Sequence, residues 1–447
     1  MFLKGMIFIN IFINKLINII IISFFSMSLI LPKLYSEMKL VILFILILIS
    51  LINIMSRSIK IKKDILLWYL SFILYHLVWI TIAIYNNNNI VALINTFRLF
   101  VIYPLIFLIL SLSLSNSKSN KFHIIFNTIF VSNFIISIYT ILLFIDSINL
   151  IDINFLYQLS FTISRGVHQG YTKIGGENIT TLFFTFPFIL TYYNHSENKN
   201  DKFLILNIII SIFAILISGR RMLQLVIIIS LFLNLITRFL FINKTNKNKF
   251  ISLKSVVNFV IIIFLFFISV YFINNFYSFD IFLQRMIKAF SLSEDNVRYL
   301  QIIELLKHFT DNPFIGVGFG KGIDTVVRST SRPWAYEVTY VLQLYQTGII
   351  GFIIYILLLI YNIYLGIKVI LRNKDKYMFS LLNGYICFLI ACISNPLLAS
   401  FDFMWTIYII PLYVNYLYLT KKRSKRSKFL NEKNRNYHFK LEWRSRY

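Results

Sequence analysis

Charged residues are scarce in this chain. Asp, Glu, Lys and Arg make up 14% of its 447 residues, against about 25% in an average soluble domain. Hydrophobic residues make up 58%, and they gather in repeated runs long enough to cross a bilayer. These proportions exclude a cytosolic enzyme and a disordered chain, and they predict a polytopic helical membrane protein.

Cysteine is also nearly absent. The two cysteines, Cys387 and Cys392, lie in one apolar segment. Their spacing on a helix suits neither a disulfide nor a zinc site, so a secreted disulfide scaffold is excluded. We expect both to be small buried apolar residues.

The apolar runs predict an all-α fold, a polytopic membrane protein of about twelve transmembrane helices with a large, partly helical extracytoplasmic loop. The predicted crossings cover residues 10–31, 38–55, 65–85, 90–114, 122–145, 178–194, 203–218, 222–242, 256–275, 338–367, 378–396 and 402–419. The membrane domain then spans residues 1–419, with the extracytoplasmic loop at about 276–337 inside it. Residues 420–447 form a basic cytoplasmic tail.

Acidic residues are few, with 18 Asp and Glu against 44 Lys and Arg, for a net charge of +26. The cations cluster between alternate pairs of crossings and in the tail that begins Lys421-Lys422-Arg423, as the positive-inside rule expects. This pattern places both termini in the cytoplasm. A nucleic-acid-binding tail is the alternative, but contact with anionic lipid headgroups explains cations beside a membrane better.

Two sizeable segments then lie outside, at about residues 146–177 and 276–337. In the second, Ser293-Glu294-Asp295 marks a helix start, and residues 297–309 carry apolar side chains at helical spacing. Asp311-Asn312-Pro313 ends this predicted helix.

A glycine run, Gly316-Val317-Gly318-Phe319-Gly320-Lys321-Gly322, follows the predicted outer helix. Its spacing matches neither a dinucleotide-binding loop nor a P-loop. Two interpretations remain: the glycines let the backbone turn and approach another segment closely, or the loop contacts an anion directly.

Several arginines fall outside the cytoplasmic loops. Arg220 and Arg221 occupy a short outer turn, where they face either a cavity or lipid headgroups. Arg298 opens the outer helix, where a plain surface charge is the alternative role. The other basic candidates in the outer segments are Arg165, His168, Arg328 and Arg332. Because guanidinium groups bind phosphate bidentately, these residues predict a fixed, multiply charged anion such as a lipid diphosphate.

Glu337 stands out among the few acids near the outer face, because it opens the crossing after the large loop. A partly desolvated carboxylate there is a candidate general base for the attacking hydroxyl of a sugar. The alternative is an acid favoured by the helix N-terminus. Glu177 and Asp402 are weaker candidates, for which we expect structural roles.

These motifs resemble the signature of the O-antigen ligase and Wzy-type polymerase superfamily. The matching elements are Arg298, Asn312-Pro313-Phe314-Ile315-Gly316-Val317-Gly318-Phe319-Gly320, Glu337, Leu342-Gln343-Leu344-Tyr345-Gln346-Thr347-Gly348-Ile349-Ile350-Gly351 and Ser218-Gly219-Arg220. The resemblance covers about residues 175–400.

One departure from the pattern separates the two branches of this superfamily. Ligases carry a His-Asn pair eleven residues before a Gly-x-x-Gly pair, and here Gly348 and Gly351 form that pair with Glu337 at the place of the histidine. The sequence therefore resembles the repeat-unit polymerases, many of which lack the histidine. The spacing from Arg165 to Gly176 also resembles an outer-loop element of some polymerases.

The resemblance implies extracytoplasmic polymerisation of undecaprenyl-diphosphate-linked oligosaccharide repeat units into O-antigen, capsule or exopolysaccharide. It implies a glycosyltransferase without metal or other cofactor, with Glu337 as base, Arg298, Arg220 and Arg221 on the diphosphate, and Arg165 on the glycan. The site is expected on the outer face of a bacterial inner membrane. Expected partners are the lipid-linked substrates, membrane lipids, and a chain-length regulator and flippase of the same pathway, but no nucleic acid. The alternatives are a ligase that transfers glycan to a lipid or protein, and a flippase for the lipid-linked units.

Overall fold

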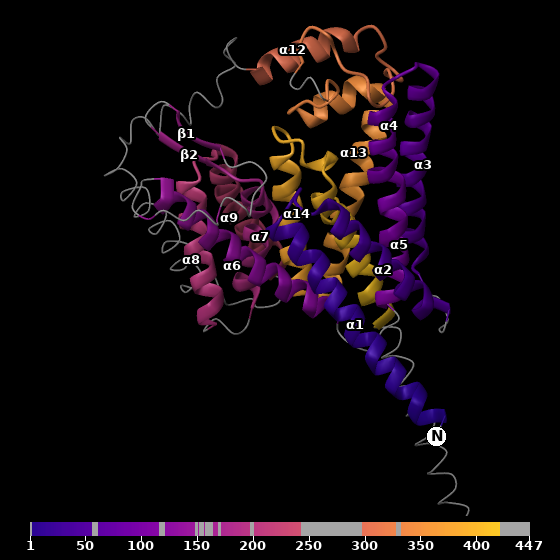
Figure 1. The fold of residues 1–447 in the computed structure, drawn as a ribbon, viewed down its shortest axis with the longest axis vertical. Helices are drawn as coiled ribbons and strands as arrows, with labels where there is room; N and C mark the ends of the chain where they lie inside the picture. The colour runs from indigo at the N-terminus through magenta and orange to yellow at the C-terminus, as the bar shows by residue number, and fades with distance from the viewer. Residues whose placement is uncertain are drawn as a thin grey trace, which may run out of the picture.

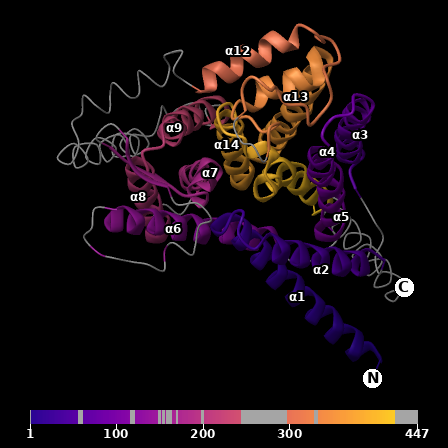
Figure 2. The ribbon, with the colours of Figure 1, turned by 45° about the horizontal axis from the view of Figure 1, so that its top comes forward.

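The computed structural model describes residues 2–55, 61–115, 121–147, 151, 156, 164–168, 171–196, 201–242, 297–327 and 332–420, and the statements below concern these residues. The predicted crossing at 256–275, the basic tail after residue 420 and the candidate Arg328 lie outside the described residues. Figure 1 shows a helical bundle with a short helix, α12, lying across one end, and Figure 2 shows α12 next to α13.

Most of the described residues are helical. The helices are α1 (Phe2–Ile30), α2 (Ser36–Met55), α3 (Lys63–Tyr85), α4 (Ile90–Phe97), η1 (Arg98–Ile102), α5 (Tyr103–Ser115), α6 (Lys121–Ser147), η3 (Asn178–Thr181), α7 (Leu182–His195), α8 (Lys202–Ile217), α9 (Arg221–Ile242), α12 (Val297–Phe309), α13 (Thr339–Asn373), α14 (Lys376–Ala391), η4 (Leu397–Ala399) and η5 (Phe401–Phe403). A further helix covers residues 405–420. The bounds of α12 confirm the helix predicted at 297–309.

Four described helices are long and apolar enough by themselves to cross a membrane, as expected of a membrane protein. They are Lys63–Tyr85, Ile90–Leu114, Lys121–Ser147 and Thr339–Asn373. Large apolar side chains also remain exposed along α13, among them Ile353, Leu357 and Ile360. An apolar stripe of this kind on the outside of a helix suits contact with lipid rather than water.

The structure departs from a purely helical chain at one described hairpin. Strands β1 (Ser164–His168) and β2 (Tyr171–Gly175) pair antiparallel, with Arg165 opposite Ile174. The hairpin lies in the predicted outer segment 146–177. It places the backbones of Arg165 and His168 on one strand.

Polar side chains join the helices inside the bundle. Asn133 of α6 donates through Nδ2 to Asn207 Oδ1 (2.8 Å) and Ser211 Oγ (2.6 Å) of α8, and it accepts from Thr185 of α7 (2.7 Å). Asn383 of α14 similarly donates to Thr191 of α7. Buried polar groups between apolar helices need such partners, so these contacts fix which faces of α6, α7, α8 and α14 meet.

Helix α13 is broken at Gly348, which has φ +64° and ψ −178°. The break frees backbone groups on both sides, and residues 313–318 supply partners for three of them. The amides of Ile349 and Ile350 donate to the carbonyls of Pro313 (2.8 Å) and Phe314 (3.2 Å). Conversely, the amide of Gly318 donates to the carbonyl of Gln346 (2.8 Å).

The side chain of Trp79 completes this junction. Its indole Nε1 donates to the carbonyls of Ile315 (2.9 Å) and Thr347 (3.0 Å). A Cβ on Gly318 would collide with the backbone of Ala83 in α3, so this glycine lets two segments touch. The first interpretation of the glycine run is confirmed here: it is a turn that packs closely against α3 and α13.

Among the described residues, connections between helices make contacts at two opposite ends of the bundle (Figure 1). At the α12 end, turn 31–35 contacts Glu177 and Asp402, and turn 86–89 contacts the glycine run. At the other end, Lys62 contacts Asn415 and Tyr413 contacts Asp375. All of the connections named at the α12 end belong to the predicted outer loops.

Candidate functional site

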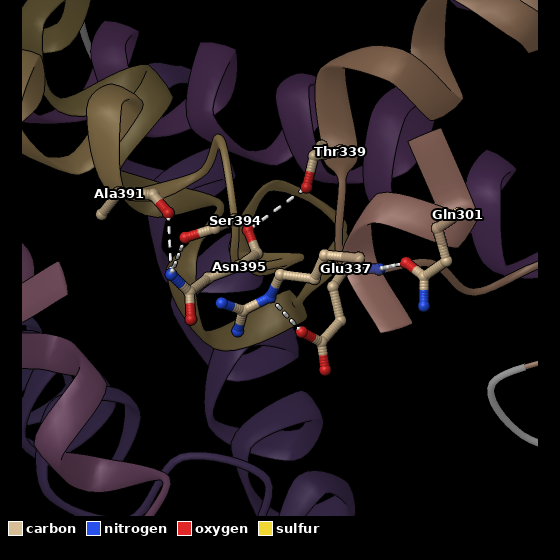
Figure 3. A network of polar contacts seen from close by, with 7 residues as sticks. Gln301, Glu337, Thr339, Ala391, Ser394 and Asn395 are labelled. Carbon is tan, nitrogen blue, oxygen red and sulfur yellow. Dashed lines mark hydrogen bonds and ion pairs between the residues drawn. The ribbon is translucent and has the colours of Figure 1, made fainter. Parts of the chain in front are cut away.

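The carboxylate of Glu337 lies beside the guanidinium of Arg298. The Nε of Arg298 donates to Oε2 of Glu337 over 2.6 Å. The backbone amide of Glu337 donates to the side-chain Oε1 of Gln301 over 2.9 Å, as Figure 3 shows. Arg298 and Gln301 lie one turn apart on α12, so one face of this helix holds both the backbone and the side chain of Glu337. We call Arg298 and Glu337 the Glu337 pair.

A small apolar core holds Glu337 in position. Its neighbours in the chain, Tyr336 and Val338, are buried together with Leu305 of α12, Ile323 and Tyr345. The amide of Ile323 donates to the hydroxyl of Tyr336 over 2.7 Å, and burial raises the pKa of this hydroxyl. Glu337 is therefore a polar residue between two buried neighbours that hold its backbone in place. Its side chain remains 27% exposed.

The first turn of α13 is also tied to the end of α14. Thr339 donates through Oγ1 to the carbonyl of Asn395 over 3.2 Å. Asn395 in turn donates through Nδ2 to the carbonyl of Ala391 (2.9 Å) and to Ser394 Oγ (3.2 Å). Because Asn395 and Asp402 lie on one connection, this contact links the Glu337 pair to a second group of charges.

The second group, which we call the Arg220 cluster, joins five charged side chains from segments that are distant in sequence. Its members are Lys33, Lys39, Glu177, Arg220 and Asp402. Lys33 donates through Nζ to Glu177 Oε1 over 2.6 Å, and Arg220 donates through Nη2 to the carbonyl of Gly176 over 2.8 Å. Burial lowers the pKa of Arg220 to about 10, and the nearby carboxylate of Glu177 opposes this shift. Arg220 therefore remains a cation at neutral pH.

The most buried part of the Arg220 cluster is the ion pair of Lys39 and Asp402. Their side chains are 0% and 5% exposed, and Lys39 Nζ lies 2.6 Å from Asp402 Oδ1. Lys39 also donates to the carbonyl of Leu31 (2.6 Å), and Asp402 Oδ2 accepts from the amide of Lys33 (2.8 Å). Both carboxylate oxygens of Asp402 thus have a donor, as the burial of an ion pair requires. The pair fixes the turn between α1 and α2 against η5.

The remaining predicted residues lie in different surroundings. Arg221 is the exposed first residue of α9, directly after Arg220. Arg332 is exposed in the turn before α13. Arg165 and His168 are placed by their backbones in β1, and Arg328 lies outside the described residues. The structure thus brings Arg298 to Glu337, and it brings Arg220 to Glu177.

Three residues of these sites were missed by the sequence analysis, namely Lys33, Lys39 and Gln301. Lys39 carried a usable signal, because an ionisable residue inside a predicted crossing calls for a partner or a function. Lys33 and Gln301 carried none, since an exposed turn lysine and a helix glutamine are ordinary in any sequence. Their importance comes only from contacts with Glu177, Asp402 and Glu337.

The described part of the chain contains no group of three or more His, Cys, Asp or Glu side chains that could hold a metal ion. Both described cysteines are buried and unpaired with each other, which confirms the expectation for them. In comparisons with known proteins, no family model matches this chain, and no curated protein matches its sequence. The two sites are therefore defined by their geometry in the structure alone.

Proposed function

We propose that this protein polymerises lipid-diphosphate-linked oligosaccharide units at the outer face of a bacterial inner membrane, with the Glu337 pair as its reaction centre. The observation that carries the proposal is the carboxylate of Glu337, partly exposed and held by a guanidinium at the end of the bundle where the predicted outer loops meet. Both termini are cytoplasmic in this proposal, and the chain crosses the membrane about twelve times.

The connections between helices support the proposed topology. If the chain crosses the membrane as proposed, the turns at 31–35, 86–89 and 218–220 lie on the same side as α12. The contacts are consistent with this topology, because each of the three turns contacts another predicted outer segment. Predicted cytoplasmic connections likewise contact predicted cytoplasmic helix ends.

In the proposed reaction, a hydroxyl of the acceptor sugar attacks the anomeric carbon of the donor glycan. The carboxylate of Glu337 takes the hydroxyl proton, and the bond between the anomeric carbon and the diphosphate oxygen breaks. The lipid diphosphate leaves with the bonding electrons, and Arg298 stabilises its charge. A guanidinium suits this role because its planar donors match phosphate oxygens.

The test compares two glutamine variants in a strain that lacks the endogenous gene. Glu337→Gln removes the basic carboxylate but keeps the size of the side chain, so we expect single repeat units to accumulate at the outer face and chain formation to fall about 100-fold or more. Glu304→Gln is the matched control, since Glu304 lies on α12 and accepts from Thr325 (2.8 Å). Gel profiles of the glycans from both strains give the readout.

Three outcomes contradict the proposal in different ways. Long chains made by Glu337→Gln would show that Glu337 is not the base. Long chains that stay on their carrier lipid in the deletion strain would indicate a ligase. Repeat units trapped on the cytoplasmic face of the deletion strain would indicate a flippase.

A further inference from the structure

One of the apolar helices long enough to cross a membrane carries an exposed cation inside its span. Arg98 lies in the span Ile90–Leu114, eight positions from the end that faces α12, or about 12 Å along a helix. Arg98 is exposed, and so is Asn95, three positions before it. Because residues three apart lie on the same face of a helix, the two side chains share one outer face. We call Asn95 and Arg98 the Arg98 patch.

The sequence gives a local reason for the backbone shape at the Arg98 patch. Pro104 has no amide hydrogen, so the carbonyl of Phe100 cannot accept the usual helical hydrogen bond from it. The backbone forms the π turn η1 instead, in which the amide of Tyr103 donates to the carbonyl of Arg98. Phe100, inside this turn, stacks on His76 of α3 with ring centroids 4.3 Å apart. The turn that carries Arg98 is therefore anchored to α3, and π turns inside helices are frequent at functional sites.

The side chains of the Arg98 patch are not used within the described part of the protein. No hydrogen bond or ion pair joins Asn95 or Arg98 to another described side chain, whereas the hydroxyl of Thr96 donates to the carbonyl of Ala92 over 2.8 Å. A guanidinium alone among hydrocarbon is strongly unfavourable. Side chains of a helix tilt toward its N-terminus, so Arg98 is directed back toward Asn95 and the nearer membrane surface.

The surroundings of the Arg98 patch suit a phospholipid. The anions that reach this depth of a bilayer are lipid phosphates, and a guanidinium binds phosphate oxygens through two parallel N–H groups. Exposed Ile94, Ile102 and Leu105 lie in the same span, where they suit contact with acyl chains. Figure 1 shows α3, α4 and α5 along one side of the bundle, so a lipid can approach this span from the bilayer.

We infer that Asn95 and Arg98 form a binding site for one anionic phospholipid, whose phosphate is bound by Arg98. The lipid supplies the counter-charge that the described side chains do not. An anionic headgroup is favoured over phosphatidylcholine, because the choline cation weakens the attraction to a guanidinium. The assignment of this lipid to the outer leaflet rests on the proposed topology, but the site itself does not depend on the proposed reaction.

The experiment maps lipid contacts on the full chain purified in detergent. The probe is a phosphatidylglycerol with a photoactivatable group in one acyl chain, and mass spectrometry of peptides measures the labelling of residues 90–105. We expect Arg98→Gln to reduce this labelling about tenfold, because one charge-assisted contact is lost. Arg98→Lys should retain about half of the labelling, since it keeps the charge but not the bidentate geometry. Asn95→Leu should reduce the labelling about twofold.

The matched control is Arg372→Gln, which removes an exposed arginine from the last turn of α13, at the opposite end of the bundle. Labelling of residues 90–105 should then match the unmodified protein within about twofold. Thermal unfolding of each variant shows that it is folded. Because Asn95 and Arg98 are exposed, we expect their variants to unfold like the unmodified protein.

Competition identifies the ligand. Unlabelled phosphatidylglycerol should displace the probe, and phosphatidylcholine should need an about tenfold higher concentration. No labelling at residues 90–105, labelling that survives Arg98→Gln, an equal loss in Arg372→Gln, or equal displacement by phosphatidylcholine would overturn the site. Stronger displacement by farnesyl diphosphate would also overturn it, because the site would then select a prenyl diphosphate. Labelling needs no turnover, so this result is separate from the test of Glu337.

Discussion

Two of the ion pairs at the α12 end, Lys39–Asp402 and Arg298–Glu337, have the same nitrogen-to-oxygen distance, 2.6 Å, but very different surroundings. Lys39 and Asp402 are 0% and 5% exposed, whereas Arg298 and Glu337 are 46% and 27% exposed. Burial makes the first pair expensive to break, because either charge alone would be left without water. The second pair is screened by solvent and contributes at most about 1 kcal/mol to stability.

This difference suits the two pairs to different roles, a structural one for the buried pair and the proposed chemical one for the Glu337 pair. The buried pair joins α2 to η5 and fixes the turn that carries Lys33. The Glu337 pair joins α12 to the start of α13, and solvent reaches both of its members. In the proposed reaction, Glu337 accepts a proton and Arg298 binds the leaving group, and both roles need the solvent exposure that this pair has.

The largest expected effect comes from breaking the buried pair. Asp402→Asn leaves the ammonium of Lys39 in an apolar interior, so we expect a loss of about 3–5 kcal/mol in the free energy of unfolding. Thermal or denaturant unfolding in detergent measures this loss. The double variant Lys39→Met with Asp402→Leu removes both charges and should recover much of the stability. A single variant as stable as the unmodified protein would show that the pair is not a structural support.

A smaller effect is expected at Gly348, where α13 is broken and packs against residues 313–315. Gly348→Ala places a Cβ at φ +64°, where it would collide with the backbone of Phe314. We expect a loss of about 2 kcal/mol or more, since both strain and a disrupted turn result. Gly366→Ala is the control. Its Cβ would meet only flexible side chains, those of Leu382 at 3.1 Å and Met378 at 3.6 Å, so it should be neutral or slightly stabilising. Similar losses in both variants would contradict the role assigned to the break.

The smallest effect on stability is expected when the Glu337 pair is broken. Arg298→Gln should change the free energy of unfolding by less than about 1 kcal/mol, while chain formation in cells falls strongly because the leaving diphosphate loses its cation. Lys307→Gln, another cation on α12, serves as the control for both measurements. If Arg298→Gln destabilises the protein as much as Asp402→Asn, the two pairs do not differ as described.

The local features were predictable from sequence. Helix α12 has the bounds that its apolar spacing and the Asp311-Asn312-Pro313 stop predicted, and the glycine run proved to be a close-packed turn. The partners of the charges were not predictable. Lys39 and Asp402 are separated by more than three hundred and sixty positions, and Gln301 reaches Glu337 only because α12 lies across the start of α13.

The amino-acid sequence by itself determined where apolar helices form, where α12 begins and ends, and which cations avoid the predicted cytoplasmic loops, because these properties depend on neighbours along the chain. Only the tertiary structure decided that Arg298 pairs with Glu337 while Arg220 binds the carbonyl of Gly176, next to Glu177. The reason is physical: a charge in an apolar bundle takes the partner that packing brings within reach, and packing depends on which helix faces touch.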